Sequence, residues 1–141
     1  MKTTLVKNEE RAPKWYLIDA QGQTLGRLSS KVVGILRGKN NANYTPNVDT
    51  GDFVIVVNAE KIAVSGKKST NKLYHRHTGF PGGYRSESFD KLIARVPTRP
   101  LEKAIKGMLP HTRLGDAQFT KVKIYAGAEH PHAAQQPIVI K

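Results

Sequence analysis

The sequence predicts an α/β fold built on a parallel sheet. Residues Phe53–Val57 are all apolar, which is typical of a central parallel strand covered by helices on both faces. A second strand-like segment, Trp15–Asp19, precedes it, and a stretch with helical periodicity lies between the two. Strand, helix, loop and strand in this order form a right-handed crossover by default, so we expect the two strands to lie parallel in one sheet.

The first helix is predicted from a periodic run that follows the turn signal Gln21-Gly22. Thr24 is a suitable N-cap, and Gly38 stands where helices often end. The apolar positions with helical spacing are Leu25, Leu28, Val32, Ile35 and Leu36. A polar loop is expected over residues 39–52, where Asp49 and Asp52 fit turn roles better than acid–base chemistry.

The second half of the chain predicts three more helices and one more strand. Residues 62–64 could briefly extend the second strand. The exposed segment at about 67–86 could open with a strand at Leu73–His77. Ser88 is a suitable cap for a helix over about Phe89–Arg95. A helix over 100–108 begins with proline and carries Leu101, Ala104, Ile105 and Met108 on one face. A short helix over 114–119 and a last strand over 122–125 complete the predicted core.

Three regions follow from this assignment. We expect an N-terminal extension over 1–13 and a core domain over 14–126, which includes an exposed basic arm at about 67–86. Residues 127–141 show no periodicity and predict an extended C-terminal tail. The first residues lack the apolar stretch of a signal peptide, and no apolar run approaches the length of a membrane helix.

The charge of the chain is strongly positive and unevenly distributed. The formal net charge is +12, from 23 Lys and Arg against 11 Asp and Glu. Residues 1–60 carry 8 basic and 6 acidic side chains, whereas residues 61–141 carry 15 and 5. Such an excess repels itself in a compact fold, and a polyanion such as nucleic acid relieves the repulsion. A solvated basic surface without a specific partner is the alternative.

Other functional classes find little support in the sequence. There is no Cys, which excludes disulfides and thiolate metal sites. Two His-x-His pairs are present, His75 with His77 and His130 with His132. Neither pair has a further ligand at a familiar spacing, so we expect no metal. Gly66-Lys67-Lys68 fails the phosphate-loop pattern, and no catalytic constellation is evident. We therefore expect no enzyme activity.

Within the arm, the stretch Lys72–Arg85 is the strongest candidate for binding. It interleaves basic side chains with aromatic residues and histidines, and glycines interrupt it. Lys and Arg neutralise phosphates, planar side chains stack on unpaired bases, and glycine backbone can approach a phosphate closely. RNA contact is therefore the preferred interpretation, and a mobile surface loop with incidental charge is the alternative.

Several segments, taken in order, carry a family resemblance over about residues 14–137. They are Trp15-Tyr16-Leu17-Ile18-Asp19-Ala20, Thr24-Leu25-Gly26-Arg27-Leu28, Leu36-Arg37-Gly38-Lys39, Tyr44-Thr45-Pro46, Asp49-Thr50-Gly51-Asp52, Tyr74-His75-Arg76-His77-Thr78-Gly79-Phe80-Pro81-Gly82-Gly83, Lys106-Gly107-Met108-Leu109-Pro110, Lys123-Ile124-Tyr125-Ala126-Gly127, His130-Pro131-His132 and Gln135-Gln136-Pro137. This ordered set resembles the bacterial large-subunit ribosomal protein thirteen family.

The resemblance implies a fold, a role and a set of partners. The fold is a three-layer α/β/α core with a four-stranded parallel sheet, plus basic loops and an extended C-terminal tail. The role is that of an early-assembling structural component of the large ribosomal subunit in the cytoplasm, without a cofactor. Its implied partners are large-subunit (23S) rRNA and neighbouring large-subunit proteins, with no membrane and no small-molecule substrate.

We expect the RNA contacts to come from cations that hold phosphates and from planar side chains that meet sugars and bases. Arg76 is the strongest single candidate, because a guanidinium can do both. The predicted RNA-binding residues are Arg27, Arg37, Lys39, Lys61, Lys67, Lys68, Lys72, Tyr74, His75, Arg76, His77, Lys106, Arg113, Lys121, Lys123, His130 and His132.

Two other functions stay open at this stage. A nuclease would need a carboxylate cluster or a metal site and would cleave when divalent metal is added. A free regulatory RNA- or DNA-binding protein would be scarce and largely unbound to ribosomes. A secondary role in binding its own message is compatible with the same basic surface.

Overall fold

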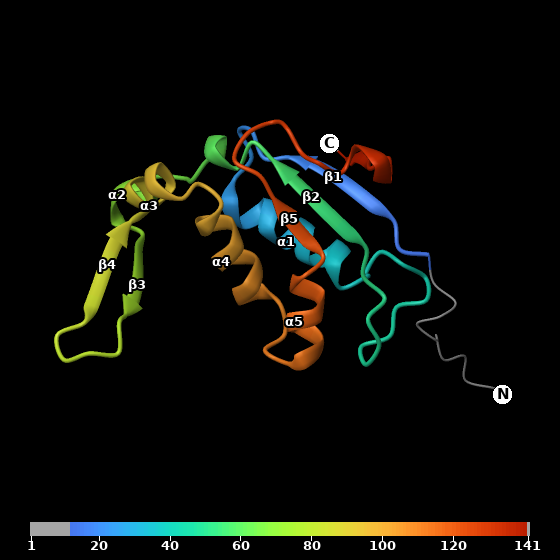
Figure 1. The fold of residues 1–141 in the computed structure, drawn as a ribbon, viewed down its shortest axis with the longest axis horizontal. Coiled ribbons are helices and arrows are strands. Elements are labelled where there is room, and N and C mark those ends of the chain that lie inside the picture. Colours follow the sequence, from blue (N-terminus) through green and yellow to red (C-terminus); the bar gives the residue numbers. More distant parts are fainter. Residues whose placement is uncertain (1–11, 141) are drawn as a thin grey trace.

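A computed structural model of the protein describes residues 12–140 (Figure 1). All but the last two residues of the predicted extension at 1–13 lie outside this range. The elements in chain order are β1 (Trp15–Asp19), α1 (Leu25–Leu36), β2 (Phe53–Val57), η2 (Ala59–Lys61), α2 (Lys68–Asn71), β3 (Leu73–His77), β4 (Tyr84–Ser88), α3 (Phe89–Arg95), α4 (Arg99–Met108), α5 (Arg113–Phe119), β5 (Val122–Ile124), η3 (Ala133–Gln135) and β6 (Ile138–Ile140).

The main sheet has four parallel strands in the order β5-β2-β1-β6. β1 and β2 pair along their full lengths, from Trp15 opposite Phe53 to Asp19 opposite Val57. The predicted α/β fold with a four-stranded parallel sheet is confirmed. The expectation that the strand at 122–125 is the last one is wrong, because residues 138–140 return beside β1 as an edge strand.

Helix α1 covers the predicted periodic run, and a backbone hydrogen bond, not a side-chain cap, fixes its first turn. Thr24 occupies the N-cap position, but its side chain makes no capping hydrogen bond. Instead the Leu25 N–H donates to the Ala63 carbonyl at 2.9 Å, and Thr24 forms an isolated parallel bridge with Ala63. The predicted strand extension at 62–64 is therefore reduced to this single bridge.

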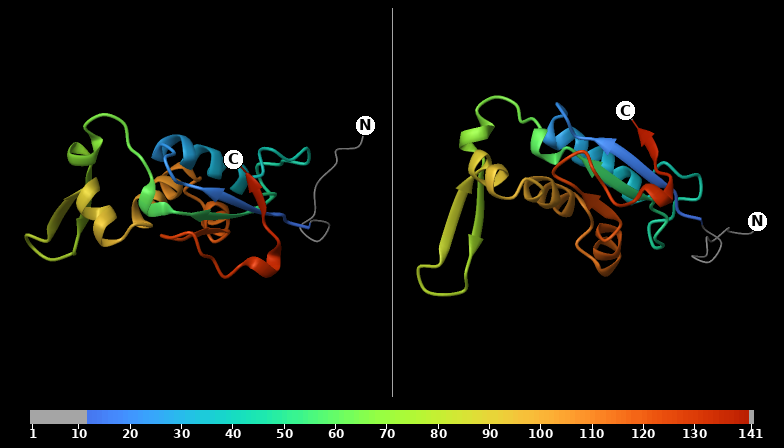
Figure 2. Two further views of the ribbon diagram at one scale, coloured as in Figure 1. Left: turned by 90° about the horizontal axis from the view of Figure 1, so that it is seen from above. Right: turned by 45° about the horizontal axis from the view of Figure 1, so that its top comes forward.

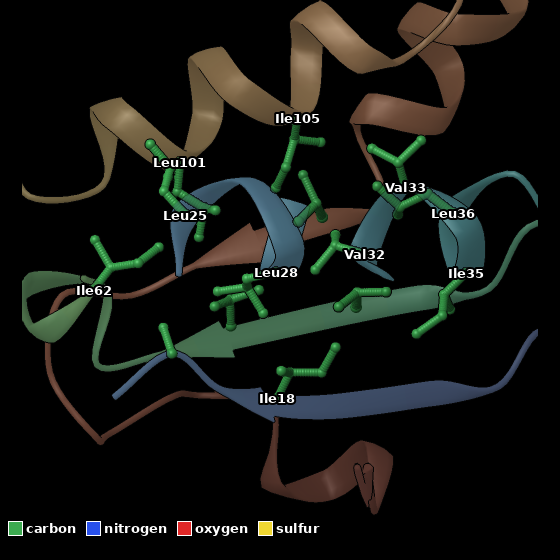
Figure 3. Packing of buried hydrophobic residues seen from close by; sticks show 14 of the residues in the cluster. Ile18, Leu25, Leu28, Val32, Val33, Ile35, Leu36, Ile62, Leu101 and Ile105 are labelled. Carbon is green, nitrogen blue, oxygen red and sulfur yellow. The ribbon is translucent and has the colours of Figure 1, made fainter. Parts of the chain in front are cut away.

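The core lies between the sheet and two helices, with α1 between α4 and the strands (Figure 3). Leu28 and Val32 of α1 are fully buried, as are Leu101 and Ile105 of α4. Met108, predicted for the same face of α4, is instead 44% exposed because it lies in the last turn of the helix.

The opposite face of the sheet carries its own aromatic cluster. The rings of Trp15 and Phe53 stack with their centroids 4.3 Å apart, and the His132 ring lies 5.3 Å from Trp15. The C-terminal segment with η3 thus contacts the face that α1 leaves uncovered. This placement is consistent with the expected three-layer arrangement.

The loop between α1 and β2 is tied closely to the end of the helix. A Cβ added at Gly51 would overlap the Leu36 carbonyl oxygen, so only glycine permits this approach. The Gly51 N–H donates to Asp49 Oδ1 at 3.2 Å, and the Asp52 N–H donates to the Ile35 carbonyl at 3.2 Å. The predicted turn role of Asp49 is confirmed.

The basic arm is a β-hairpin that projects away from the sheet (Figures 1 and 2). β3 and β4 pair antiparallel, with Arg76 directly opposite Arg85. The turn closes through Thr78 N–H to the Gly83 carbonyl at 3.0 Å and Gly83 N–H to the Phe80 carbonyl at 2.9 Å. The sequence indicated β3 but not β4, and α2 and α3 join the hairpin to the body.

Candidate nucleic-acid interface

The hairpin presents two chemically different faces, because neighbouring side chains on a strand point to opposite sides. One face, here called the inner face, carries Tyr74, Arg76, Arg85 and Glu87. The outer face carries Leu73, His75 and His77 from β3 and Tyr84, Ser86 and Ser88 from β4. The Arg and Glu side chains of the two strands are therefore on the inner face, and exposed aromatic and imidazole rings occupy the outer face.

The inner face and helices α3 and α4 form a groove of about 210 Å³, here called the arm groove. Its lining residues are Tyr74, Arg76, Arg85, Glu87, Leu92, Arg95, Val96, Arg99 and Lys103. Glu87 is the one carboxylate among them, and its Oε2 accepts a hydrogen bond from Arg95 at 2.7 Å. This bond, with the charges of Arg95, Arg76 and Lys103, lowers the pKa of Glu87, so the carboxylate stays ionised.

Tyr74 forms part of the framework of the arm. Its ring is half-buried, with the ammonium groups of Lys72 and Lys103 at 5.5 and 5.3 Å from the ring centroid. Its hydroxyl is buried without a hydrogen-bond partner among the described residues, and burial raises the pKa of Tyr74. The position of Tyr74 therefore does not favour the expected stacking of its ring on a base.

The outer face offers the accessible aromatic surface instead. Tyr84 is 59% exposed and Phe80, in the turn, is 74% exposed. The Tyr84 hydroxyl lies 2.6 Å from His75 Nδ1, and the two rings stack 5.6 Å apart with an interplanar angle of 19°. His77 Nδ1 accepts the Gly79 N–H at 2.9 Å, which orders the start of the turn.

A second groove brings together predicted cations from distant parts of the sequence. Arg27 of α1, Lys68 of α2 and Lys72 line a groove of about 650 Å³ between the arm and the body. Leu25, Val64, Ala104 and Met108 contribute apolar side chains to its lining. The second groove thus groups three of the predicted RNA-binding residues, whereas Tyr74 and Arg76 line the arm groove.

Other predicted residues have structural partners within the chain. The Lys121 ammonium lies 2.5 Å from Asp49 Oδ2 and donates to the Gly51 carbonyl at 3.1 Å, so its charge anchors the loop before β2. His132 Nε2 lies 2.8 Å from the Tyr125 hydroxyl, and the His132 N–H donates to His130 Nδ1 at 3.2 Å. These contacts order the C-terminal segment.

The remaining predicted residues are spread over the body. Arg37 donates to the Tyr44 hydroxyl at 3.2 Å, and the Lys106 ammonium lies 5.8 Å from the centroid of the Phe119 ring. The others are Lys39, Lys61, Lys67 and Arg113, which are exposed, and Lys123, which is half-buried. They do not join the two grooves.

Within residues 12–140, no three His, Cys, Asp or Glu side chains gather as metal ligands would. No helix in the same range is long and apolar enough to cross a membrane. Both His-x-His pairs take part in local hydrogen bonds.

Comparison with known proteins places this architecture in a family. A family model described as Ribosomal protein L13 matches residues 13–131. The chain belongs to the ribosomal protein L13 family. It is 60% identical to the large ribosomal subunit protein uL13 of Synechococcus sp. (strain JA-2-3B'a(2-13)), over 98% of this chain and 91% of that protein. It is 59% identical to the uL13 of Aeromonas hydrophila subsp. hydrophila, over 99% of each chain.

The similarity to the L13 family extends further than the sequence motifs indicated. The motifs quoted above begin at Trp15, whereas the alignment with the Aeromonas protein covers 140 residues and so includes most of the first 13. The resemblance found in the sequence is therefore confirmed, and it applies to nearly the whole chain.

In this L13-family chain, the arm groove contains four cations that are absent from the predicted RNA-binding set. Arg85, Arg95, Arg99 and Lys103 all line the arm groove. Two signals in the sequence could have identified them. The first is the spacing of four between residues 95, 99 and 103, and the second is the hairpin register that places Arg85 opposite Arg76.

Proposed function

We propose that this chain is a structural constituent of the large ribosomal subunit that binds large-subunit (23S) rRNA and supports early subunit assembly. The observation that carries the proposal is the projecting hairpin, whose inner face and base hold more cations than nearby carboxylates can neutralise. Membership of the ribosomal protein L13 family supports it, since relatives of this chain are named as large-subunit proteins.

The proposed mechanism divides the work between the body and the arm. The parallel sheet and its helices form a rigid body that fixes where the hairpin projects. Arg and Lys side chains along the arm hold backbone phosphates, and the exposed rings of Tyr84 and Phe80 meet unpaired bases. The partners are 23S rRNA and neighbouring large-subunit proteins in cytoplasmic ribosomes, and the role requires no catalysis.

Sedimentation tests the proposal directly. Cell lysate is fractionated on sucrose gradients at physiological and high salt, and the chain is detected in each fraction. We expect one copy per large subunit, retained at high salt because contacts beyond simple charge attraction hold it. A peak at the top of the gradient, or loss at modest salt, would contradict the proposal and favour a free regulator or an enzyme.

Base stacking by the outer face can be measured separately from phosphate contact. Tyr84→Ala should raise the Kd for large-subunit RNA about tenfold, since stacking contributes about 1–3 kcal/mol per base. The salt dependence of binding should stay unchanged, because no charge is removed. Fluorescence titration over a range of salt concentrations gives both quantities.

Tyr84→Phe is the matched control for this substitution. It keeps the ring and removes the hydroxyl that contacts His75, so binding close to that of the wild type is expected. Equal losses for Tyr84→Phe and Tyr84→Ala would show that the hydroxyl, and not the ring, is what matters.

A further inference from the structure

The arm groove brings together cations that repel one another in the free protein. Arg76 and Arg85 are directly opposite across the two strands, and like charges in that position destabilise a hairpin. The groove contains one carboxylate, Glu87, and Arg95 already bonds to it at 2.7 Å. Arg76 and Arg85 form no ion pair with any residue in the described part of the chain.

Two further cations border this pair. Arg99 lies 3.4 Å from Glu102, an exposed contact that contributes little stability. Lys103 rests against the ring of Tyr74 and makes no ion pair within residues 12–140. The groove therefore holds five cations against the single carboxylate that lines it.

The apolar part of the groove strengthens its attraction for an anion. Leu92 is 3% exposed and Val96 is half-buried, so part of the wall excludes water. Charge attraction increases where the local dielectric is lower. Guanidinium groups also match the geometry of phosphate oxygens, because their N–H donors form a planar fork.

We propose that the arm groove is a phosphate site in which Arg76 and Arg85 together bind a phosphodiester of the RNA backbone, with Lys103 beside them. This inference rests on the proposed function for the identity of the RNA. A bound phosphate places negative charge between the two arginines and turns their repulsion into shared attraction. The hairpin is thus built to be less stable alone than on RNA.

This proposal predicts opposite effects of one substitution on stability and on binding. Arg85→Gln removes the cross-strand repulsion and should raise the melting temperature of the free protein by about 1–3 °C at low ionic strength. The same variant should bind large-subunit RNA more weakly and lose about 0.7–0.9 from the log–log salt slope. If Arg85 had only a structural role, its replacement would lower the melting temperature.

The experiment uses the purified full chain and follows thermal unfolding with inorganic phosphate or with chloride at equal ionic strength. Phosphate should raise the melting temperature of the wild type more than chloride does, because it binds the folded state. Arg85→Gln should lose this difference. Lys14→Gln should keep it, because it also removes one charge from an exposed lysine but lies just before β1 and does not line the arm groove.

Arg76→Gln makes the same change on the other strand and should likewise lose the phosphate-specific rise in melting temperature. Arg85→Lys keeps the charge, so it should retain the salt slope of the wild type while binding RNA more weakly. A lower melting temperature for both Gln variants, with no phosphate-specific effect in the wild type, would overturn the site. A phosphate effect lost in Arg85→Gln without any change in RNA binding would show a site for free phosphate only and overturn the RNA assignment. If phosphate acts as expected but the wild type binds no large-subunit RNA, the proposed function fails and the anion site stands.

Discussion

Val56→Asp is expected to unfold the protein. Val56 is fully buried in β2, where it pairs in register with Ile18 of β1 and Ile124 of β5. A carboxylate there would be buried without a partner, which costs about 3–5 kcal/mol or more. This loss is comparable with the total stability of a small domain, about 5–15 kcal/mol. Circular dichroism during heating should show no cooperative transition.

Val139→Asp is the matched control, because it makes the same change in the same sheet. Val139 lies in the edge strand β6 and is 66% exposed, so its carboxylate would remain in water. We expect this variant to unfold cooperatively within a few degrees of the wild type. A soluble, cooperatively folded Val56→Asp would contradict the central position of β2.

The contrast between these two valines shows which strands the sequence could predict. Phe53–Val57 is apolar throughout, and such a run is recognisable because both faces of a central strand are covered. Ile138–Ile140 has only three residues and follows an aperiodic segment, so the local sequence does not mark it as a strand. It becomes one by pairing with β1, which lies at the other end of the chain. Local periodicity carries no information about a pairing of that kind.

The arm shows the same limit at the candidate site. Tyr84–Ser88 contains two serines and a glutamate, which have low strand propensity, and the strand forms because β3 pairs with it across the turn. Basic and aromatic composition identified the arm as the binding element. Only the hairpin register revealed that Arg76 faces Arg85 and that Tyr74 points inward.

The same geometry explains why Lys121 is a poor probe of RNA binding although the sequence favours it. Its ammonium is held by Asp49 and by the Gly51 carbonyl, so replacing it removes an internal anchor. Loss of binding in such a variant would report on folding. Informative substitutions must therefore lie on exposed cations of the arm that have no carboxylate partner.

Replacing both Lys72 and Arg76 by Ala should weaken rRNA binding and reduce its salt dependence. Both side chains are exposed. Arg76 lines the arm groove and Lys72 lines the second groove. Each lost phosphate contact removes about 0.7–0.9 from the log–log slope of affinity against salt, so the double variant should lose about 1.4–1.8. Affinity measured on large-subunit RNA at several salt concentrations gives this slope.

Asn71→Ala combined with Ser86→Ala provides the matched control. Both residues are exposed, one beside Lys72 and one on the strand that pairs with β3, and neither carries charge. The control should keep the slope of the wild type, because no counterion release is lost. A double Lys72/Arg76 variant that binds weakly with an unchanged slope would show that these residues act without touching phosphate. The arm would then bind through the rings of its outer face, and Tyr84 would be the residue to examine next.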